Sequence, residues 1–364
     1  MKYIDEFRDK RLIAKVAGRI RNVADPGRVY TFMEVCGTHT TAIFRFGLRE
    51  LLPDNIRLVS GPGCPVCVTP NDYLDKAIAI AKLDGVTVAT FGDMMRVPGS
   101  RSSLELEKAK GASIRAVYST GDALKLARKD PARQIVFLGV GFETTAPTVA
   151  ASILEAKREG LRNYSVLCGH KTMPSCLAAL LDGGEVNVDG FLLPGHVSAV
   201  IGTKPYRFLA ERYHKRCVVA GFEPCDVMEA ILMLIKQPKP VVEIQYSRII
   251  GSGGNALARG VMEKVFSKTS SLWRGMGRVA GSGLAIRREF AFYDAEKRFK
   301  PKVAASREPK GCLCGDVLKG IKMPPECRLF AKACTSEHPV GACMVSSEGT
   351  CAAYFKYMRR QWTG

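Results

Sequence analysis

The sequence predicts an α/β fold with two similar Rossmann-like parallel-sheet halves that face a cleft, followed by a third, cysteine-rich domain. Three observations predict this fold. Short apolar runs alternate with helix-like patterns over residues 28–240, the first half of that region resembles the second, and six of the 13 cysteines gather near the end of the chain. Alternating strands and helices are typical of a parallel sheet covered by helices, and ligands of such sheets bind beyond the carboxyl ends of the strands.

Apolar runs that end at Gly, Pro or Cys mark the expected strands. They are 29–35, 56–60, 86–91 and 114–118 in the first half, and 135–139, 165–167, 191–193 and 218–220 in the second. Between these runs, apolar residues recur with helical spacing, for example over Tyr73–Leu83 and Ala123–Arg128, which favours amphipathic helices there.

An internal repeat supports this division. A shift of 104 residues places Gly37 on Gly141, Thr40 on Thr144, Thr41 on Thr145, Cys64 on Cys168 and Asp122 on Asp226. Fixed-offset similarity of this kind predicts a duplicated unit. We therefore expect two related domains at 28–130 and 131–240, and a third domain at 241–364 on which residues 1–27 pack.

Composition limits the class of protein. The chain has 364 residues and a net charge of +19, but it has no long basic block interleaved with aromatic residues, so we expect no nucleic-acid partner. No run of 18 apolar residues and no secretory leader occur, so we expect a cytoplasmic chain without a membrane partner. Thiols stay reduced in the cytoplasm, and clustered cysteines there indicate metal or redox chemistry.

The loop after the first expected strand combines a thiol with an imidazole. Cys36 and His39 are three residues apart in Cys36-Gly37-Thr38-His39, which suits either a nucleophile with its base or two metal ligands. Glu143 occupies the repeat position of His39, and we expect it to orient that imidazole and raise its basicity; a capping role at a helix entry is the alternative. His170 and His196 follow strands in similar loops.

A second cysteine motif follows the next expected strand. Cys64 and Cys67 lie three residues apart in Cys64-Pro65-Val66-Cys67, a spacing that allows a disulfide or a shared metal. Thr69 and Pro70 resemble the N-cap and first residue of a helix. The pair would then precede a helix N-terminus, where the helix dipole favours thiolate; a buried, inert pair is the alternative.

The end of the chain is rich in cysteine. The six residues are Cys312, Cys314, Cys327, Cys334, Cys343 and Cys351. Four thiolates hold zinc or an iron–sulfur cluster, and the absence of two CxxC knuckles favours a cluster. The glycine run Gly251–Gly254 before Asn255 could bind an anion, but it lacks GxGxxG and Walker spacing, which favours a flexible turn.

Taken together, these motifs resemble those of one known family. CGTHT (36–40), GPGCPVC (61–67), FGDMMRVPGS (91–100), GFETTAP (141–147), PGHVSAVIG (194–202) and the tail cysteine pattern are similar to those of the HypD family of NiFe-hydrogenase maturation proteins. The resemblance implies a cytoplasmic scaffold rather than an ordinary metabolic enzyme. Its implied partners are the chaperone HypC, the cyanide-supplying protein HypE and the hydrogenase large-subunit precursor, and its cargo is iron with two cyanide ligands and one carbon monoxide.

The resemblance also implies roles for individual residues. Cys36 matches the iron-holding cysteine, with His39 in the same motif, and Cys64 with Cys67 matches a redox-active pair. The ligands of a 4Fe-4S cluster fall on Cys312, Cys327, Cys334 and Cys351. Cys314 and Cys343 are extra thiols, so the choice within each neighbouring pair stays open.

The same residues are also compatible with other functions. One alternative is a thiol reductase in which a cluster feeds the CxxC pair. The others are an ATP-using enzyme and a basic nucleic-acid binder.

Overall fold

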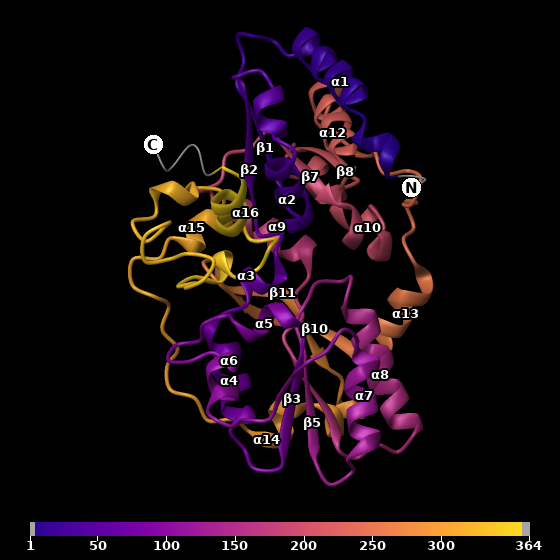
Figure 1. Ribbon diagram of the computed structural model, residues 1–364. Helices are drawn as coiled ribbons and strands as arrows, with labels where there is room; N and C mark the ends of the chain where they lie inside the picture. The colour runs from indigo at the N-terminus through magenta and orange to yellow at the C-terminus, as the bar shows by residue number, and fades with distance from the viewer. Residues whose placement is uncertain (1–3, 359–364) are drawn as a thin grey trace.

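Two separate parallel sheets form the framework of the chain (Figure 1). The computed structural model describes residues 4–358; residues 1–3 and 359–364, at the outer ends of the expected terminal segments, lie outside the described residues. Sheet A contains, in spatial order, β2 (Ile56–Ser60), β1 (Tyr30–Glu34), β7 (Gly190–Pro194), β8 (Arg216–Ala220) and β9 (Val242–Ile244). Sheet B contains β4 (Ile114–Ala116), β3 (Val86–Thr90), β5 (Gln134–Gly139) and β6 (Tyr164–Cys168). Every strand pairing in both sheets is parallel. The predicted α/β class and its strands are therefore confirmed, and β9 is an additional strand.

The two sheets do not follow the expected boundary at residue 130. Sheet A pairs β1 with β7, and sheet B pairs β3 with β5, so each expected half supplies strands to both sheets. The repeat nevertheless explains the order of the strands. A shift of 104 residues moves the start of β1 onto that of β5 and the start of β3 onto that of β7. The order β2-β1-β7-β8 in sheet A thus corresponds to β6-β5-β3-β4 in sheet B. Two similar units are present, but they exchange half of their strands.

Helices pack on these sheets. The longer helices are α1 (Lys10–Val23), α2 (Gly37–Arg45), α4 (Asn71–Ala81), α7 (Thr120–Lys129), α8 (Ala146–Arg158), α9 (Met173–Asp182), α10 (Gly195–Ile201), α12 (Pro224–Lys236) and α13 (Ala256–Val265). The short helices are η1 (Asp5–Arg8), η2 (Leu48–Leu51), α3 (Pro65–Val68), α5 (Gly92–Met95), α6 (Leu104–Ala109), η3 (Lys204–Tyr206) and α11 (Arg207–Glu211). Residues 4–358 contain no helix with the length and apolar character needed to cross a membrane.

The N-terminal helix does not pack on the cysteine-rich segment as expected. Ile13, Val16 and Ile20 of α1 share a buried core with Ile231 of α12 and with sheet A. Figure 1 shows α1 beside α12, away from the tail. The reason is the amphipathic pattern of α1, whose apolar stripe finds its partner on the outer face of sheet A.

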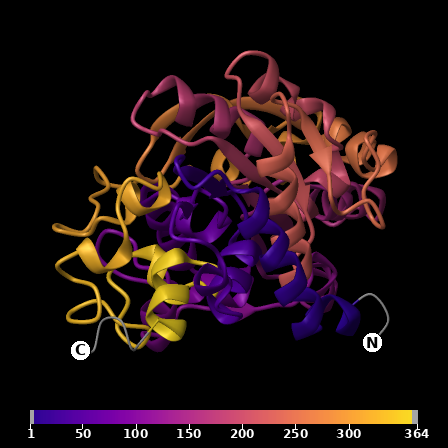
Figure 2. The same ribbon diagram turned by 90° about the horizontal axis from the view of Figure 1, so that it is seen from above.

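The C-terminal part of the chain is divided between two places. The hairpin of β10 (Phe266–Trp273) and β11 (Gly277–Ile286) packs beside α9. The later elements are η4 (Arg288–Tyr293), α14 (Ala295–Phe299), α15 (Cys314–Leu318), η5 (Pro324–Glu326), η6 (Ala342–Met344) and α16 (Thr350–Tyr357). Of these, α16 packs on α2, and Figure 2 shows this last part of the chain beside the N-terminal segments. The cysteine-rich segment is thus placed against the loops that follow β1 and β2.

Candidate functional site

Cys36 lies at the N-cap of α2, two residues beyond the end of β1. The loop of the second cysteine motif packs directly on it: the amide of Gly37 donates to the carbonyl oxygen of Gly63 at 3.1 Å. A Cβ at Gly63 would overlap the backbone nitrogen of Cys36, so this contact requires glycine. The two motifs are therefore joined backbone to backbone.

The environment of Cys36 keeps its thiol protonated. The residue is buried, and burial raises its pKa to about 12, with further contributions from the nearby carboxyl groups of Glu348 and Glu34. The backbone amides of Thr38 and His39, at the start of α2, oppose this shift. A thiolate forms here when a cation compensates the cost of burying its charge.

His39 is a neutral, buried imidazole. Its Nε2 lies 2.9 Å from the carbonyl oxygen of Gly221, and its ring stacks on Phe222 with centroids 5.1 Å apart. Burial lowers its pKa to about 4. Its Nδ1 is buried without a hydrogen-bond partner. The imidazole therefore retains one nitrogen that has no partner in the protein.

The expected pairing of Glu143 with His39 is not present. Glu143 Oε1 accepts a hydrogen bond from the amide of Met173 at 3.0 Å, and its Oε2 and His39 Nδ1 are both without a partner. The physical reason is the strand exchange, because β1 leads to His39 in sheet A and β5 leads to Glu143 in sheet B. Burial raises the pKa of Glu143 to about 7.

Cys64 and Cys67 form a disulfide. Cys64 is the N-cap of α3, where its sulfur accepts the amide of Cys67 at 3.2 Å, and both cysteines are buried. The expected cap at Thr69 is wrong: Pro70 is the N-cap of α4, and the hydroxyl of Thr69 donates to Pro65 O at 2.8 Å. The pair therefore belongs to the first turn of a short helix of its own.

A buried arginine, which the sequence analysis missed, holds the end of α3. The Nε of Arg274 donates to Cys67 O at 3.1 Å, and its Nη2 donates to Thr69 O at 2.9 Å. Its Nη1 pairs with Glu308. Arg274 comes from the turn of the β10–β11 hairpin, and no local sequence signal connects that turn with the CxxC motif.

The six tail cysteines line one small hollow together with apolar side chains such as Leu313 and Phe330. Cys314 and Cys343 face each other, with their sulfur atoms 3.0 Å apart. The sulfur of Cys67 lies 3.9 Å from the carbonyl oxygen of Ala342, beside that hollow.

Cysteine thiolates bind both zinc and iron–sulfur clusters. In the described part of the chain, no three His, Cys, Asp or Glu side chains converge closely enough for one metal ion. The thiolates of an iron–sulfur cluster bind different irons and do not need to meet at a point. Six sulfurs around one apolar hollow therefore fit a cluster.

Polar contacts connect the tail to the Cys36 motif and to the segment that follows β3. Thr38 of α2 donates to Glu348 Oε1 at 2.7 Å, and Ser346 donates to Asp93 Oδ2 at 2.9 Å. Arg96 donates to Ser336 O at 2.6 Å. Asp93 and Arg96 follow β3, within the motif FGDMMRVPGS (91–100). Glu348 was missed because its partner Thr38 is 310 residues away in the sequence.

The other two histidines have different surroundings. His170 is buried against Phe266, and its Nδ1 lies 3.6 Å from the sulfur of Cys168. His196 stacks on Phe222 with ring centroids 3.8 Å apart. Phe222 therefore contacts both His39 and His196.

The glycine run at 251–254 leads into α13. Asn255 is the N-cap of this helix, and its side-chain oxygen accepts the amide of Ala258 at 3.0 Å. Gly254 has a φ of +64° and packs against the backbone of Gly202. This position requires glycine for the turn itself.

The chain matches a known protein family and several known proteins over almost its whole length. The family described as "HypD: Hydrogenase formation hypA family" matches residues 11–358. The chain belongs to the HypD family. It is 49% identical over 370 residues to "Hydrogenase maturation factor HypD" of Rhizobium leguminosarum bv. viciae, covering 99% of this chain and 96% of the relative. It is 42% identical to the protein of that name from Escherichia coli, covering 99% of each. Membership of the HypD family assigns the chain to hydrogenase maturation.

Proposed function

We propose that this chain is a cytoplasmic scaffold on which the Fe(CN)2CO unit of NiFe-hydrogenase is assembled. It works with HypC and HypE and passes the iron centre to the hydrogenase large-subunit precursor. One observation carries the proposal. Three sets of cysteines from distant parts of the sequence meet in one series of contacts: Cys36 packs on Gly63, next to Cys64, and Cys67 contacts Ala342, next to Cys343.

Cys36 is the residue that holds the iron cargo. Ferrous iron with cyanide and carbon monoxide ligands prefers soft thiolate donors. The thiol of Cys36 is protonated in the free chain, because burial raises its pKa to about 12. Its proton must therefore leave as iron binds. His39, whose Nδ1 has no partner, is the nearby neutral imidazole that could accept a proton or a metal.

The resident cofactor of the tail is proposed to be a 4Fe-4S cluster held by Cys312, Cys327, Cys334 and Cys351. These four residues are the ligands that the family resemblance implies, and they line one hollow together with Cys314 and Cys343. When bound, such a cluster stores and transfers single electrons. The chain's own contribution is to place these thiols around one hollow with apolar side chains and to hold Cys67 beside it.

Cys64 and Cys67 supply the electrons that release cyanide. In the dithiol form they react with a thiocyanate, R–S–CN, on HypE. The S–CN bond breaks, a thiol R–SH and HCN form, and the Cys64–Cys67 sulfur–sulfur bond forms with the loss of two electrons and two protons from the pair. The disulfide in the structure corresponds to the product state of this step.

Complementation of a strain that lacks its HypD protein tests the proposal. Cys36→Ala should abolish hydrogenase activity, because it removes the iron-holding thiolate. Cys217→Ala is the matched control, since Cys217 is also fully buried but lies within β8, and it should retain activity. Normal hydrogenase activity with Cys36→Ala would refute the scaffold role of this residue.

A further inference from the structure

The loop that follows β8 contacts two histidines, His39 and His196. Its first residue, Gly221, accepts from His39 through its carbonyl oxygen. Its second, Phe222, lies against the rings of His39 and His196. The position of these rings therefore depends on how firmly this loop is held.

The contact with Gly221 fixes the tautomer of His39. A carbonyl oxygen only accepts hydrogen bonds, so the Nε2 that lies 2.9 Å away must carry the hydrogen. In a neutral imidazole the other nitrogen then has a free lone pair. This nitrogen, Nδ1, has no partner in the protein.

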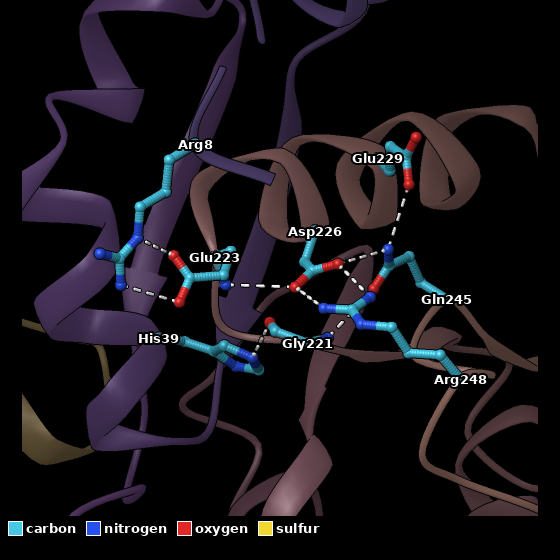
Figure 3. A network of polar contacts seen from close by, with 8 residues as sticks. All are labelled: Arg8, His39, Gly221, Glu223, Asp226, Glu229, Gln245 and Arg248. Carbon is cyan, nitrogen blue, oxygen red and sulfur yellow. Dashed lines mark hydrogen bonds and ion pairs between the residues drawn. The ribbon is translucent and has the colours of Figure 1, made fainter. Parts of the chain in front are cut away.

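Gln245 holds the loop from one side, as Figure 3 shows. Its Oε1 accepts the amide of Gly221 at 3.1 Å, while its Nε2 donates to Asp226 Oδ1 at 2.9 Å and to Glu229 Oε2 at 3.1 Å. Only a side-chain amide can accept from the loop and donate to two carboxylates at once. This arrangement requires glutamine at position 245.

Asp226 is held in turn by Arg248. The two side chains form a double hydrogen bond, with both N–O distances at 2.7 Å, and the Asp226 side chain is completely buried. Bidentate pairs of this kind fix the orientation of both groups. Asp226 Oδ2 also accepts the amide of Glu223, at the far end of the loop.

Two residues of the N-terminal segment also contact this network. Arg8 of η1 forms an ion pair with Glu223, and the ring of Phe7 lies 3.8 Å from the guanidinium carbon of Arg248. Residues 221–223 are thus held at both ends by groups outside the cysteine motifs (Figure 3).

We propose that Gln245, oriented by Asp226 and Arg248, is a positioning residue for His39. Its bond to the amide of Gly221 holds the loop, so that the carbonyl oxygen of Gly221 stays at Nε2 of His39 and the imidazole keeps the Nε2–H tautomer with a free lone pair on Nδ1. The use of that lone pair during iron assembly rests on the proposed function, whereas the tautomer is a property of the chain alone.

Long-range 1H–15N correlation spectra of the full chain, labelled with 15N-histidine and free of cargo iron, test this role. The wild type should show His39 as the Nε2–H tautomer. Gln245→Glu places a carboxylate against Asp226 and Glu229 and should release the loop. We expect the ratio of Nδ1–H to Nε2–H form at His39 to rise about tenfold, as the loss of one hydrogen bond implies.

Gln237→Glu is the matched control. Gln237 is also buried and donates to the carboxylate of Glu243 at 2.7 Å and to Cys217 O at 3.1 Å, but it has no contact with the 221–223 loop among the described hydrogen bonds. It should leave the His39 signals unchanged. Gln245→Met, which removes the acceptor for Gly221 without adding charge, should shift the tautomer ratio in the same direction and serves if Gln245→Glu does not fold.

Unchanged tautomer ratios in both Gln245 variants would overturn the inference, as would an equal change in Gln237→Glu, which would indicate a general loss of structure. These readings do not depend on iron. Failure to detect an iron–cyanide centre would refute the proposed function and leave the tautomer result intact.

Discussion

The sulfur of Cys67 lies 3.9 Å from the carbonyl oxygen of Ala342. This contact joins two segments that are 275 residues apart in the sequence. It brings the Cys64–Cys67 disulfide against the hollow lined by the tail cysteines. The proposed redox pair and the proposed cluster are therefore neighbours, and the following expectations depend on this.

Cys64→Ala and Cys67→Ala should each abolish hydrogenase maturation, because either change removes the dithiol. The tail cysteines are unchanged in both variants, so the brown absorption of the cluster should remain. Absorption spectra of the anaerobically purified variants and hydrogenase activity in complemented cells measure the two effects. A Cys64→Ala chain that supports normal maturation would contradict the redox role of the pair.

Cys327→Ala should lose most of the iron, acid-labile sulfide and visible absorption of the tail cluster, because it removes a proposed ligand. Cys314→Ala is the comparison, since Cys314 hydrogen-bonds to Cys343 and is not assigned as a ligand. It should retain the cluster with full iron and sulfide content. The reverse pattern would show that Cys314 belongs to the ligand set and that Cys327 does not.

Gly63→Ala should destabilise the chain by about 1–3 kcal/mol, the usual cost of inserting a methyl group into a packed site. The added Cβ would overlap the backbone nitrogen of Cys36. Gly18→Ala is the control: Gly18 lies within α1 with no atom near its Cβ position, so this change should stabilise by about 0.5–1 kcal/mol. Urea unfolding measures both, and a neutral Gly63→Ala would contradict the close packing of the two motifs.

Glu143→Gln should change how stability depends on pH. Burial raises the pKa of Glu143 to about 7 in the folded chain, from an ordinary value of 4.5. Between these values the folded state holds a proton that the unfolded state has lost, so wild-type stability falls as pH rises through this window. Glu143→Gln has no carboxyl group at this position, so its stability does not fall with pH for this reason. Its free energy of unfolding relative to wild type should increase by about 3 kcal/mol between pH 4 and pH 8.

Denaturant titrations at several pH values measure this difference, with Glu289→Gln as a control at an exposed carboxyl. An equal pH dependence of wild type and Glu143→Gln would contradict the raised pKa of the buried Glu143 carboxyl.

Much of the fold follows from local patterns in the sequence. The run Ile56–Ser60 forms a strand with the predicted limits, because its apolar residues and its flanking turn signals agree. The exchange of strands between the repeats could not be predicted from the sequence. The β1–β7 pairing joins residues that are far apart in the chain, and parallel strands of similar composition have several possible neighbours.

The site was predictable only in part. Cys36, Cys64 and Cys67 could be found because thiols and glycines at short spacing carry a local signal. Arg274 and Gln245 could not, since each acts on a backbone carbonyl or amide of a distant loop. The expected Glu143–His39 pair is absent because β1 and β5, which lead to these residues, belong to different sheets.

Infrared spectroscopy of the anaerobically purified complex with HypC tests the central claim most directly. If the chain carries the iron centre at Cys36, the complex should show absorption bands in the cyanide and carbon monoxide stretching region, and Cys36→Ala should remove them. A complex that supports maturation but shows no such bands would contradict the account.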